Sequence, residues 1–278
     1  MKVTLVNFAD KKFRRNQKWS SFTARYIGKI DRVIQYSPEN IDNSYVELNK
    51  ESVKYSAKGL GNYFWKPYVV NDAIKKVDDG DYMFYSDSGT IFLKSVHPLV
   101  EHMEKHQKNI MCFRLPLIEK QWTKRDAFLL MDCDTPEYTD SCQILATYFI
   151  VKKCEESIRF LKEYENYATD SRVLSDDENV LGMPNYREFI EHRHDQSILS
   201  LLSKKHKNVL IEGDISDYGR FPYRYLHDSN YIYEKDIIEH PERNIFRGTL
   251  LSNRSVHPLV YLVKYYVRVF LYKLGIRV

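Results

Sequence analysis

Residues 59–92 read GLGNYFWKPYVVNDAIKKVDDGDYMFYSDSGTIF and give the clearest indication of the fold. Pro67 suits the first turn of a helix, so the pattern predicts a helix that begins near it. The turn residues at 78–81 come next, and the apolar run at 82–85 then predicts a short buried strand. Asp87 follows this strand directly. Because ligands bind outside the carboxyl ends of strands in open α/β sheets, Asp87 is a candidate ligand-binding residue.

The rest of the chain alternates predicted strands with predicted helices. Strands are predicted at residues 2–8, 32–36, 109–114, 143–151 and 209–211, and helices at residues 11–29, 44–58, 65–76, 98–107, 154–167 and 195–204. This alternation predicts an α/β fold, with a mixed, mostly parallel sheet and helices on both of its faces. The stretch 171–188 is predicted to be a loop. The chain after residue 211 is predicted to be irregular until the carboxyl-terminal tail.

Length and composition predict one large folded domain. The chain has 278 residues, and 43% of them are hydrophobic, which is enough for a sizeable core. Its four cysteines show no CxxC spacing, so a structural zinc site or a disulfide framework is not expected. The first residues lack the apolar core of a signal peptide. We therefore expect a cytoplasmic protein in a reducing compartment.

The excess of basic charge lies at the carboxyl end of the sequence. The formal net charge is +4, and residues 256–278 contain four basic residues and no acidic one. Charges interrupt this segment too often for a spanning helix, but its apolar, aromatic and basic residues suit a helix lying on an anionic membrane surface. A helix docked on the protein body is the alternative. Nucleic acid is not an expected partner, because a nucleic-acid binder spreads basic residues over a groove.

Two motifs carry a resemblance to a known family. The first combines FWKPY at residues 64–68 with GD at 80–81 and YSDSG at 85–89, and the second is HRHDQSI at 192–198. Together they resemble the donor-binding core of bacterial GT-A glycosyltransferases, especially capsule and O-antigen enzymes. The resemblance spans roughly residues 1–215. It implies a GT-A, Rossmann-like fold and the transfer of a sugar from a nucleotide-sugar donor.

The resemblance also implies which residues form the site. Asp87 and Asp195 are the implied catalytic residues: Asp87 would anchor the donor diphosphate, and Asp195 would either take the acceptor proton or hold a donor hydroxyl. The residues implied to bind the donor are Phe8, Ala9, Asp10, Lys66, Asp87, Ser88, Gly89, His194 and Gln196. Lys66 near a helix start suits a phosphate contact, because helix N-termini favour anions. The neighbouring Trp65 is expected to pack in the core rather than to stack on a sugar.

The same chemistry raises the question of a metal. The leaving diphosphate gathers negative charge, which a divalent cation or cationic side chains must neutralise. Most GT-A enzymes present two carboxylates as Asp-x-Asp, whereas Asp87 stands between two serines. We expect Mn²⁺ or Mg²⁺ to bind through Asp87, the donor and a later histidine, either His240 or His227. Alternatively, Lys66 and arginines replace the metal.

The predicted catalytic domain covers residues 1–254, and residues 255–278 form the predicted membrane-associating helix. Within the domain we expect a nucleotide-sugar half at about 1–115 and an acceptor half at about 116–254. The resemblance predicts a UDP-linked hexose as donor and a glycan or lipid-linked acceptor in surface polysaccharide synthesis. This role predicts a peripheral location at the inner face of the plasma membrane.

Two alternative functions remain open from the sequence. Asp132 and Asp134 form an Asp-x-Asp that follows an apolar run, and they half resemble a phosphatase pattern that Pro136 interrupts. They predict a phosphohydrolase as the alternative enzyme. The missing second carboxylate at Asp87 instead suggests a non-catalytic domain that binds a glycan or a nucleotide.

Overall fold

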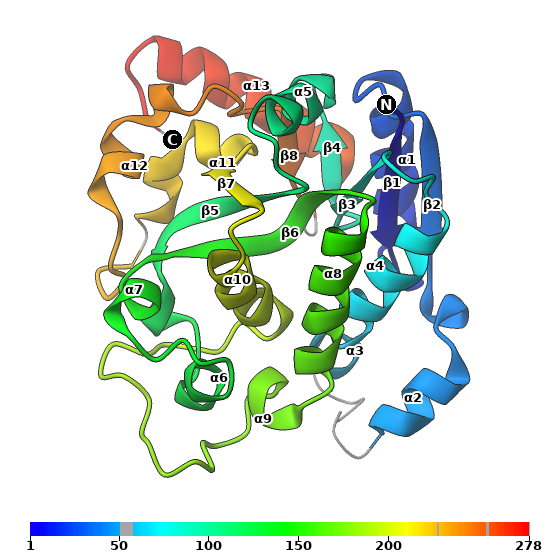
Figure 1. The fold of residues 1–278 in the computed structure, drawn as a ribbon. Helices are drawn as coiled ribbons and strands as arrows, with labels where there is room; N and C mark the ends of the chain where they lie inside the picture. The colour runs from blue at the N-terminus through cyan, green and yellow to red at the C-terminus, as the bar shows by residue number, and fades with distance from the viewer. Residues whose placement is uncertain (51–57, 227, 254–255, 278) are drawn as a thin grey trace.

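A six-stranded sheet forms the centre of the protein (Figure 1). The computed structural model describes residues 1–50, 58–226, 228–253 and 256–277. The strands lie in the order β2-β1-β3-β6-β5-β7. Their bounds are β1 (Val3–Phe8), β2 (Arg32–Tyr36), β3 (Tyr82–Ser86), β5 (Ile110–Ile118), β6 (Cys142–Lys152) and β7 (Val209–Gly213).

The sheet is mixed, as the sequence predicts. Strand β1 pairs in parallel with β2 and β3, and β5 pairs in parallel with β7. Strand β6 runs antiparallel to both β3 and β5. The six predicted strands are all present, and β5 and β7 extend beyond the predicted residues 109–114 and 209–211.

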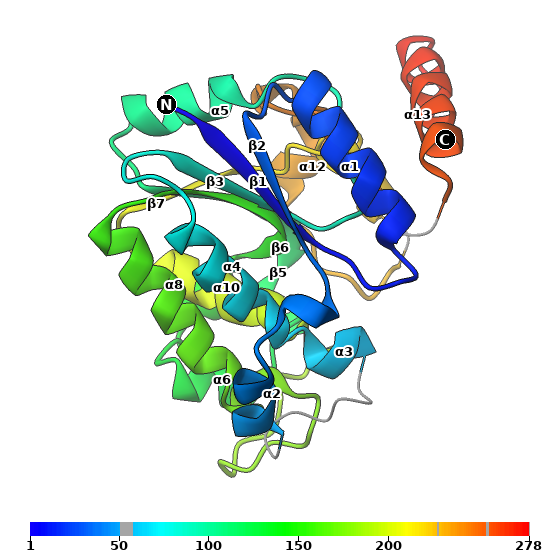
Figure 2. The same ribbon diagram turned by 90° about the vertical axis from the view of Figure 1, so that its right-hand side faces the viewer.

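Helices cover both faces of the sheet (Figure 2). The longer helices are α1 (Arg14–Tyr26), α4 (Trp65–Lys75), α5 (His97–Lys105), α8 (Glu155–Ala168), α10 (Asp195–Lys205) and α13 (Pro258–Lys273). The shorter ones are α2 (Asn43–Asn49), α3 (Lys58–Asn62), α6 (Arg125–Leu130), α7 (Pro136–Thr139), α9 (Ser171–Leu174), α11 (Asp217–Arg220) and α12 (Lys235–Glu239). One hydrophobic core lies between the sheet and α4, α8 and α10, and a second lies on the other face under α1 and α5.

The structure extends the sequence prediction in three places. The region after residue 211, predicted to be irregular, contains β8 (Leu250–Ser252), which pairs with β4 (Thr90–Phe92) as a separate two-stranded sheet. The predicted loop at 171–188 begins with α9. Of the helix predicted at 44–58, α2 is present, and residues 51–57 lie outside the described part of the chain. Three-residue strands and one-turn helices are too short to show a periodic pattern, which explains why they were missed.

A buried carboxylate fixes α10 against the sheet. Glu119 is fully buried at the end of β5, and Lys204 of α10 donates to its Oε2 at 2.6 Å. Ser200 of the same helix donates to this carboxylate as well, and Gln143 of β6 donates to its other oxygen at 3.2 Å. Because a buried charge must be paired, this network ties the helix to two strands. It thereby sets the position of Asp195 at the start of α10.

Candidate functional site

Three segments that are distant in the sequence meet near the carboxyl end of β3. Lys66 lies in the first turn of α4, Asp87 follows β3, and Asp195 is the first residue of α10. Helix α4 starts where Pro67 can occupy its first turn, and α10 starts where the polar run before it ends. The structure therefore brings together the two implied catalytic aspartates and Lys66 of the first motif.

The Lys66 ammonium is the centre of this cluster. Its Nζ lies 2.8 Å from Asp195 Oδ2 and 3.4 Å from Asp87 Oδ1, and it donates to the Ala146 carbonyl oxygen at 3.1 Å. The lysine side chain is only 5% exposed. An ammonium has three donors, and three oxygen atoms of the protein lie within 3.4 Å of this one. Lys66 thus holds the two carboxylates at fixed positions, and a contact to a donor phosphate would have to replace one of these bonds.

Electrostatics keeps Lys66 charged despite its burial. Burial disfavours the ammonium, but Asp195 and Asp87 outweigh that effect and raise the pKa of Lys66 above its ordinary value. Burial also raises the pKa of Asp195 above its ordinary value, and Lys66 offsets part of this rise. Asp195 is therefore a more basic carboxylate than one on the surface. One ammonium against two carboxylates leaves the cluster with a net negative charge.

Asp87 is the solvent-exposed residue of the cluster. Its side chain is 44% exposed, whereas that of Asp195 is 5% exposed. The Tyr85 hydroxyl donates to Asp87 Oδ1 at 2.9 Å, and Lys66 approaches the same oxygen. Both contacts use Oδ1, so Oδ2 of this carboxylate is left for a ligand.

The turn after Asp87 is held from two sides. The Asp87 amide donates to the Thr147 carbonyl at 2.7 Å, and the Gly89 carbonyl accepts from Asn253 at 3.2 Å. Ser88 between them is buried. The segment after β8 therefore closes on the turn, and Ser88 and Gly89 lie beside the exposed carboxylate.

The predicted donor-binding residues at the end of β1 lie mostly in the core. The rings of Phe8 and Trp65 stack with their centroids 3.7 Å apart, and both side chains are buried, which confirms that Trp65 packs in the core. Ala9 is buried as well, and its amide donates to the Tyr36 carbonyl. Asp10 is half-buried and accepts a hydrogen bond from the Phe13 amide at 3.1 Å, just before α1. A role for these residues in nucleotide binding stays a prediction.

His194 and Gln196 both have structural contacts. His194 is buried, its Nδ1 lies 3.1 Å from the Leu174 carbonyl, and its backbone has φ 54° and ψ −122°. Such a conformation is costly for a residue with a side chain and is concentrated at functional sites. Gln196 donates to Gln143 at 2.8 Å and accepts from the Ala146 amide at 3.3 Å. Gln196 therefore ties α10 to β6 beside the carbonyl group that Lys66 contacts.

The predicted metal ligands do not form a complete site on their own. His240 pairs with Glu242 at 3.2 Å, beside a pocket that Asp214 also lines. Asp214 accepts a hydrogen bond from Tyr148, which belongs to the core under α1 and α5. Asp87 accepts one from Tyr85, which belongs to the core on the opposite face. Asp214 and Asp87 therefore lie on different faces of the sheet. His227 lies outside the described residues. Within the described ranges, no group of three or more His, Cys, Asp or Glu side chains is arranged to hold a metal ion.

The aspartates of the alternative phosphohydrolase do not converge. Asp134 pairs with Arg125 at 2.8 Å and accepts from the Tyr186 hydroxyl at 2.7 Å. Asp132 is exposed just after α6, and the Cys133 between them is buried. Asp134 thus serves to hold the loop that contains Tyr186. The two carboxylates do not share one site.

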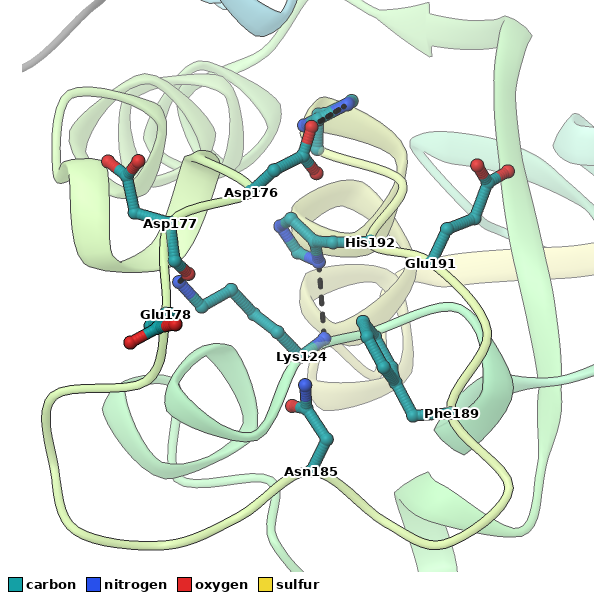
Figure 3. Close-up of a pocket in the computed structure, with 9 residues that line it drawn as sticks. Lys124, Asp176, Asp177, Glu178, Asn185, Phe189, Glu191 and His192 are labelled. Atoms are coloured by element: carbon teal, nitrogen blue, oxygen red, sulfur yellow. Dashed lines mark hydrogen bonds and ion pairs between the residues drawn. The ribbon is translucent and has the colours of Figure 1, made fainter.

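Sequence reasoning missed several residues of the cluster and its surroundings. Tyr164 of α8 contacts Asp195 at 3.4 Å, but its place on the apolar side of a helix gave no functional signal. The Ala146 carbonyl is a backbone group and leaves no trace in the sequence. A cavity also lies beside His194, in a region predicted to be a loop; its lining residues are Lys124, Asp176, Asp177, Glu178, Asn185, Phe189, Glu191, His192 and His194 (Figure 3).

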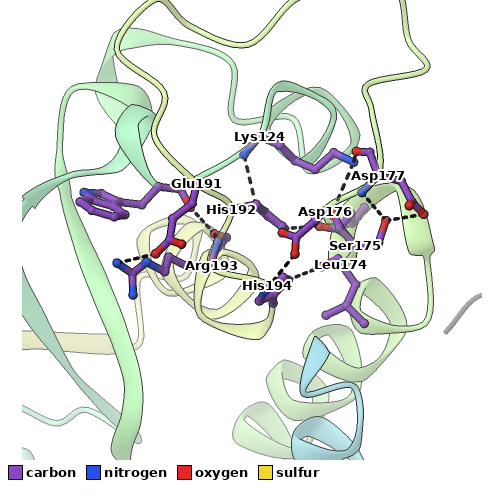
Figure 4. A network of polar contacts seen from close by, with 12 residues as sticks. Lys124, Leu174, Ser175, Asp176, Asp177, Glu191, His192, Arg193 and His194 are labelled. Carbon is purple, nitrogen blue, oxygen red and sulfur yellow. Dashed lines mark hydrogen bonds and ion pairs between the residues drawn. The ribbon is translucent and has the colours of Figure 1, made fainter. Parts of the chain in front are cut away.

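Polar contacts connect this cavity to the start of α10 (Figure 4). His192 accepts from the Lys124 amide at 3.2 Å, and its Nε2 lies 2.8 Å from the Val173 carbonyl. His194 lies 3.5 Å from Asp176. Both histidines are buried, so they form an ordered floor between the cavity and Asp195.

Comparison with known proteins identifies the fold. The chain is similar to an active-site mutant of LgtC, with a TM-score of 0.50 and 10% identity over 90% of this chain and 86% of that one. It is also similar to mouse xyloside xylosyltransferase 1 (TM-score 0.49, 12% identity, 91% and 98% covered) and to the glycosyltransferase GlyE of Streptococcus pneumoniae (0.47, 12%, 92% and 55%). No protein-family model matches the sequence, and no curated protein matches it. The fold is the GT-A fold of glycosyltransferases, as the sequence predicts.

The buried His192 predicts how stability depends on pH. Burial, reinforced by His194 and Lys124, lowers its pKa well below the ordinary value. The folded state therefore keeps His192 neutral, while the unfolded state takes up a proton below about pH 6.5. We expect the free energy of unfolding to fall as the pH drops below this value, by up to about 1.4 kcal/mol per pH unit from this group. In His192→Asn this component should disappear.

Denaturant unfolding from pH 8 to pH 5 would measure this difference. His240→Asn is the comparison variant, because His240 is 42% exposed and is therefore not enclosed by the protein as His192 is. An identical slope in the wild type and in His192→Asn would contradict the assignment of a buried neutral histidine.

Proposed function

We propose that this protein is a glycosyltransferase that uses a nucleotide-sugar donor. The observation that carries the proposal is the buried Lys66, which holds Asp87 and Asp195 together at the carboxyl end of β3 in a GT-A fold. This edge of an α/β sheet is where ligands bind. One of the two carboxylates is exposed to ligands, and the other is buried and unusually basic.

The charge of the cluster defines what the donor needs. A diphosphate does not bind unaided to a site of net negative charge, because the like charges repel each other. Asp87 fits as one ligand of a divalent cation, with the remaining ligands supplied by the donor diphosphate and water. Such a cation would neutralise the leaving diphosphate. This charge argument supports metal dependence over the alternative in which Lys66 and arginines replace the metal.

The protein's own residues supply positioning and a base. Lys66 keeps Asp195 and Asp87 in one geometry, which limits the reorganisation that transfer requires. Asp195 accepts a hydrogen bond or a proton from a substrate hydroxyl, and its raised pKa suits it to this role. The hydroxyl groups of Tyr164 and Tyr85 donate hydrogen bonds to Asp195 and Asp87, respectively.

The motifs that resemble capsule and O-antigen enzymes support a more specific role. We propose a UDP-linked hexose as donor and a glycan or lipid-linked acceptor in surface polysaccharide synthesis. Residues 1–115 would form the nucleotide-sugar half of the domain, and residues 116–254 the acceptor half.

Substitution of the cluster should abolish activity without abolishing folding. We expect Asp87→Asn and Asp195→Asn each to lower the release of UDP from UDP-glucose or UDP-galactose by about a hundredfold or more, because the first removes the proposed anchor of the donor diphosphate and the second removes the proposed acceptor of the hydroxyl proton. Lys66→Met should lose activity and also stability, by about 3 kcal/mol or more, because it leaves buried carboxylate charge unpaired. Coupled detection of UDP and denaturant unfolding measure the two effects.

Asp132→Asn is the matched control, because Asp132 is an exposed aspartate outside the cluster. It should keep full activity. Full activity in both Asp87→Asn and Asp195→Asn would sink the assignment. Phosphate release from an aryl phosphate that Asp132→Asn abolishes would favour the phosphohydrolase. Nucleotide binding by the wild type without any turnover would favour the non-catalytic alternative.

Helix α13 motivates a second part of the proposal, which concerns location. Its inner side packs on a small core through the buried Tyr265, so the helix is docked on the body. Its outer side carries a stripe of apolar residues, namely Leu259, Val263, Tyr266, Val267 and Phe270, each between 48% and 63% exposed. At 3.6 residues per turn, Lys264 lies beyond one edge of this stripe and Lys273 beyond the other, whereas Arg268 lies nearer the docked side that contains Tyr265.

An exposed apolar stripe with basic residues on both edges suits an anionic membrane surface. The apolar side chains would enter the headgroup region while the long basic side chains reach the phosphates. No helix in the described part of the chain is long and apolar enough to cross a membrane. We propose that α13 attaches the protein peripherally to the inner face of the plasma membrane.

Loss of the stripe should weaken binding to vesicles. We expect Val263→Ser combined with Phe270→Ser to reduce co-sedimentation with phosphatidylserine-containing vesicles by about tenfold or more, because each buried side chain contributes roughly 1.5 kcal/mol or more. Leu48→Ser is the control, because Leu48 is 83% exposed on another helix. Equal binding by the double variant and the wild type would leave α13 as a docked helix only.

A further inference from the structure

The cavity beside His194 has a volume of about 340 Å³. It lies between the segment around Lys124 and the long loop that follows α9 (Figure 3). A volume of this size is at the lower end of the range for small-molecule sites. It is large enough for a single sugar residue.

The loop that encloses the cavity is fastened in place. Lys124 Nζ donates to the Asp177 carbonyl at 2.7 Å, and the Arg125 amide donates to Asn185 Oδ1 at 2.8 Å. The buried Asp126 accepts from the Val180 amide at 2.7 Å. Because these bonds already order the loop, a ligand would meet a preformed pocket and would lose little affinity to ordering.

The walls of the cavity differ in character. Its floor is formed by the buried residues His192, His194 and Lys124. The rim carries four carboxylates, those of Asp176, Asp177, Glu178 and Glu191, and Glu191 forms an ion pair with Arg193 at 2.8 Å. Phe189 contributes a half-buried aromatic side chain. An aromatic side chain together with several hydrogen-bond acceptors is a lining that suits a polyhydroxylated ligand.

The charge of the residues around the cavity limits the class of ligand that can bind there. Lys124, the one lysine of the lining, donates its ammonium to the backbone carbonyls of Ser175 and Asp177, and Arg193 pairs with Glu191. Two cations against four carboxylates leave the rim with a net negative charge. A phosphate or a uronic acid would be repelled, whereas hydroxyl groups and above all an amine would be attracted.

The cavity lies next to the proposed reaction centre. His194 immediately precedes Asp195, and its ring is 6.1 Å from that of Tyr63. Lys66 Nζ lies 5.6 Å from the centre of the same Tyr63 ring. One aromatic ring thus separates the cavity floor from the lysine of the cluster.

We propose that this cavity is the acceptor subsite and that it takes a sugar residue without negative charge, preferentially one with a free amine. The assignment as an acceptor site rests on the proposed transferase function. The predicted binding of a sugar to the cavity does not depend on that function. The donor diphosphate binds elsewhere, at Asp87, because the rim of the cavity repels it.

Saturation-transfer NMR of the full chain with glucosamine, glucose and glucuronate tests the inference. At low ionic strength we expect glucosamine to bind about fivefold more tightly than glucose, and glucuronate not to bind, because the rim carboxylates attract the amine and repel the acid. The variant Asp176→Asn with Glu191→Gln should lose the preference for glucosamine. Glu188→Gln is the matched control, because Glu188 is in the same loop but pairs with Lys120 outside the cavity.

Competition separates this site from the donor site. UDP with the diamagnetic Mg²⁺ should not displace glucosamine. Displacement by UDP, binding of glucuronate equal to that of glucosamine, or an unchanged preference in the rim variant would each overturn the inference. If glucosamine binds through the rim while no nucleotide binds at all, the subsite stands as a sugar site and the transferase proposal fails. If nucleotides bind and glucosamine does not, the sugar subsite is refuted and the transferase proposal stands.

Discussion

The buried ammonium of Lys66 is the interaction on which the site depends. It joins the first turn of α4, the loop after β3 and the first turn of α10, and it also bonds the backbone of β6. Without it the buried carboxylate of Asp195 would lose its cationic partner while the second carboxylate, Asp87, lies in the same cluster, and its charge would be costly to maintain. The positions of Asp87 and Asp195 are therefore a property of this one side chain. Glu119 provides a second anchor, since it fixes α10 through Lys204 and Ser200.

Two separate regions with different electrostatic roles follow from this arrangement. At Asp87 an exposed carboxylate oxygen borders a cluster of net negative charge. A diphosphate would therefore need a cation in order to bind there. At the cavity beside His194 the carboxylates stand on the rim, which favours hydroxyl and amine groups. Asp195 lies between these regions, buried and more basic than usual. The proposed transfer reaction needs this order of parts: a place for the leaving group, a carboxylate at the reacting centre, and a place for the acceptor.

The sequence predicted the features that have a local pattern. The apolar run before Asp87 gave β3, Pro67 gave the start of α4, and the apolar spacing after Asp195 gave α10. The pairing of Lys66 with both aspartates was not predictable, because it depends on how three segments meet in space. The reversed direction of β6, the β4–β8 pair and the cavity have the same origin: each arises from contacts between residues distant in the chain. The sequence did not reveal that three protein oxygens surround the Lys66 ammonium, and its contact with the donor phosphates stays a prediction.

The most direct test of the account is calorimetry of UDP, GDP, CDP and ADP binding, each with Mn²⁺ and with EDTA, to the wild type and to Asp87→Asn. The net negative charge of the Lys66 cluster predicts micromolar binding of one nucleotide that requires Mn²⁺ and is lost in Asp87→Asn. Binding that survives both EDTA and the substitution would show that the diphosphate is held elsewhere. Failure of all four nucleotides to bind would contradict the claim that this cluster is a donor site.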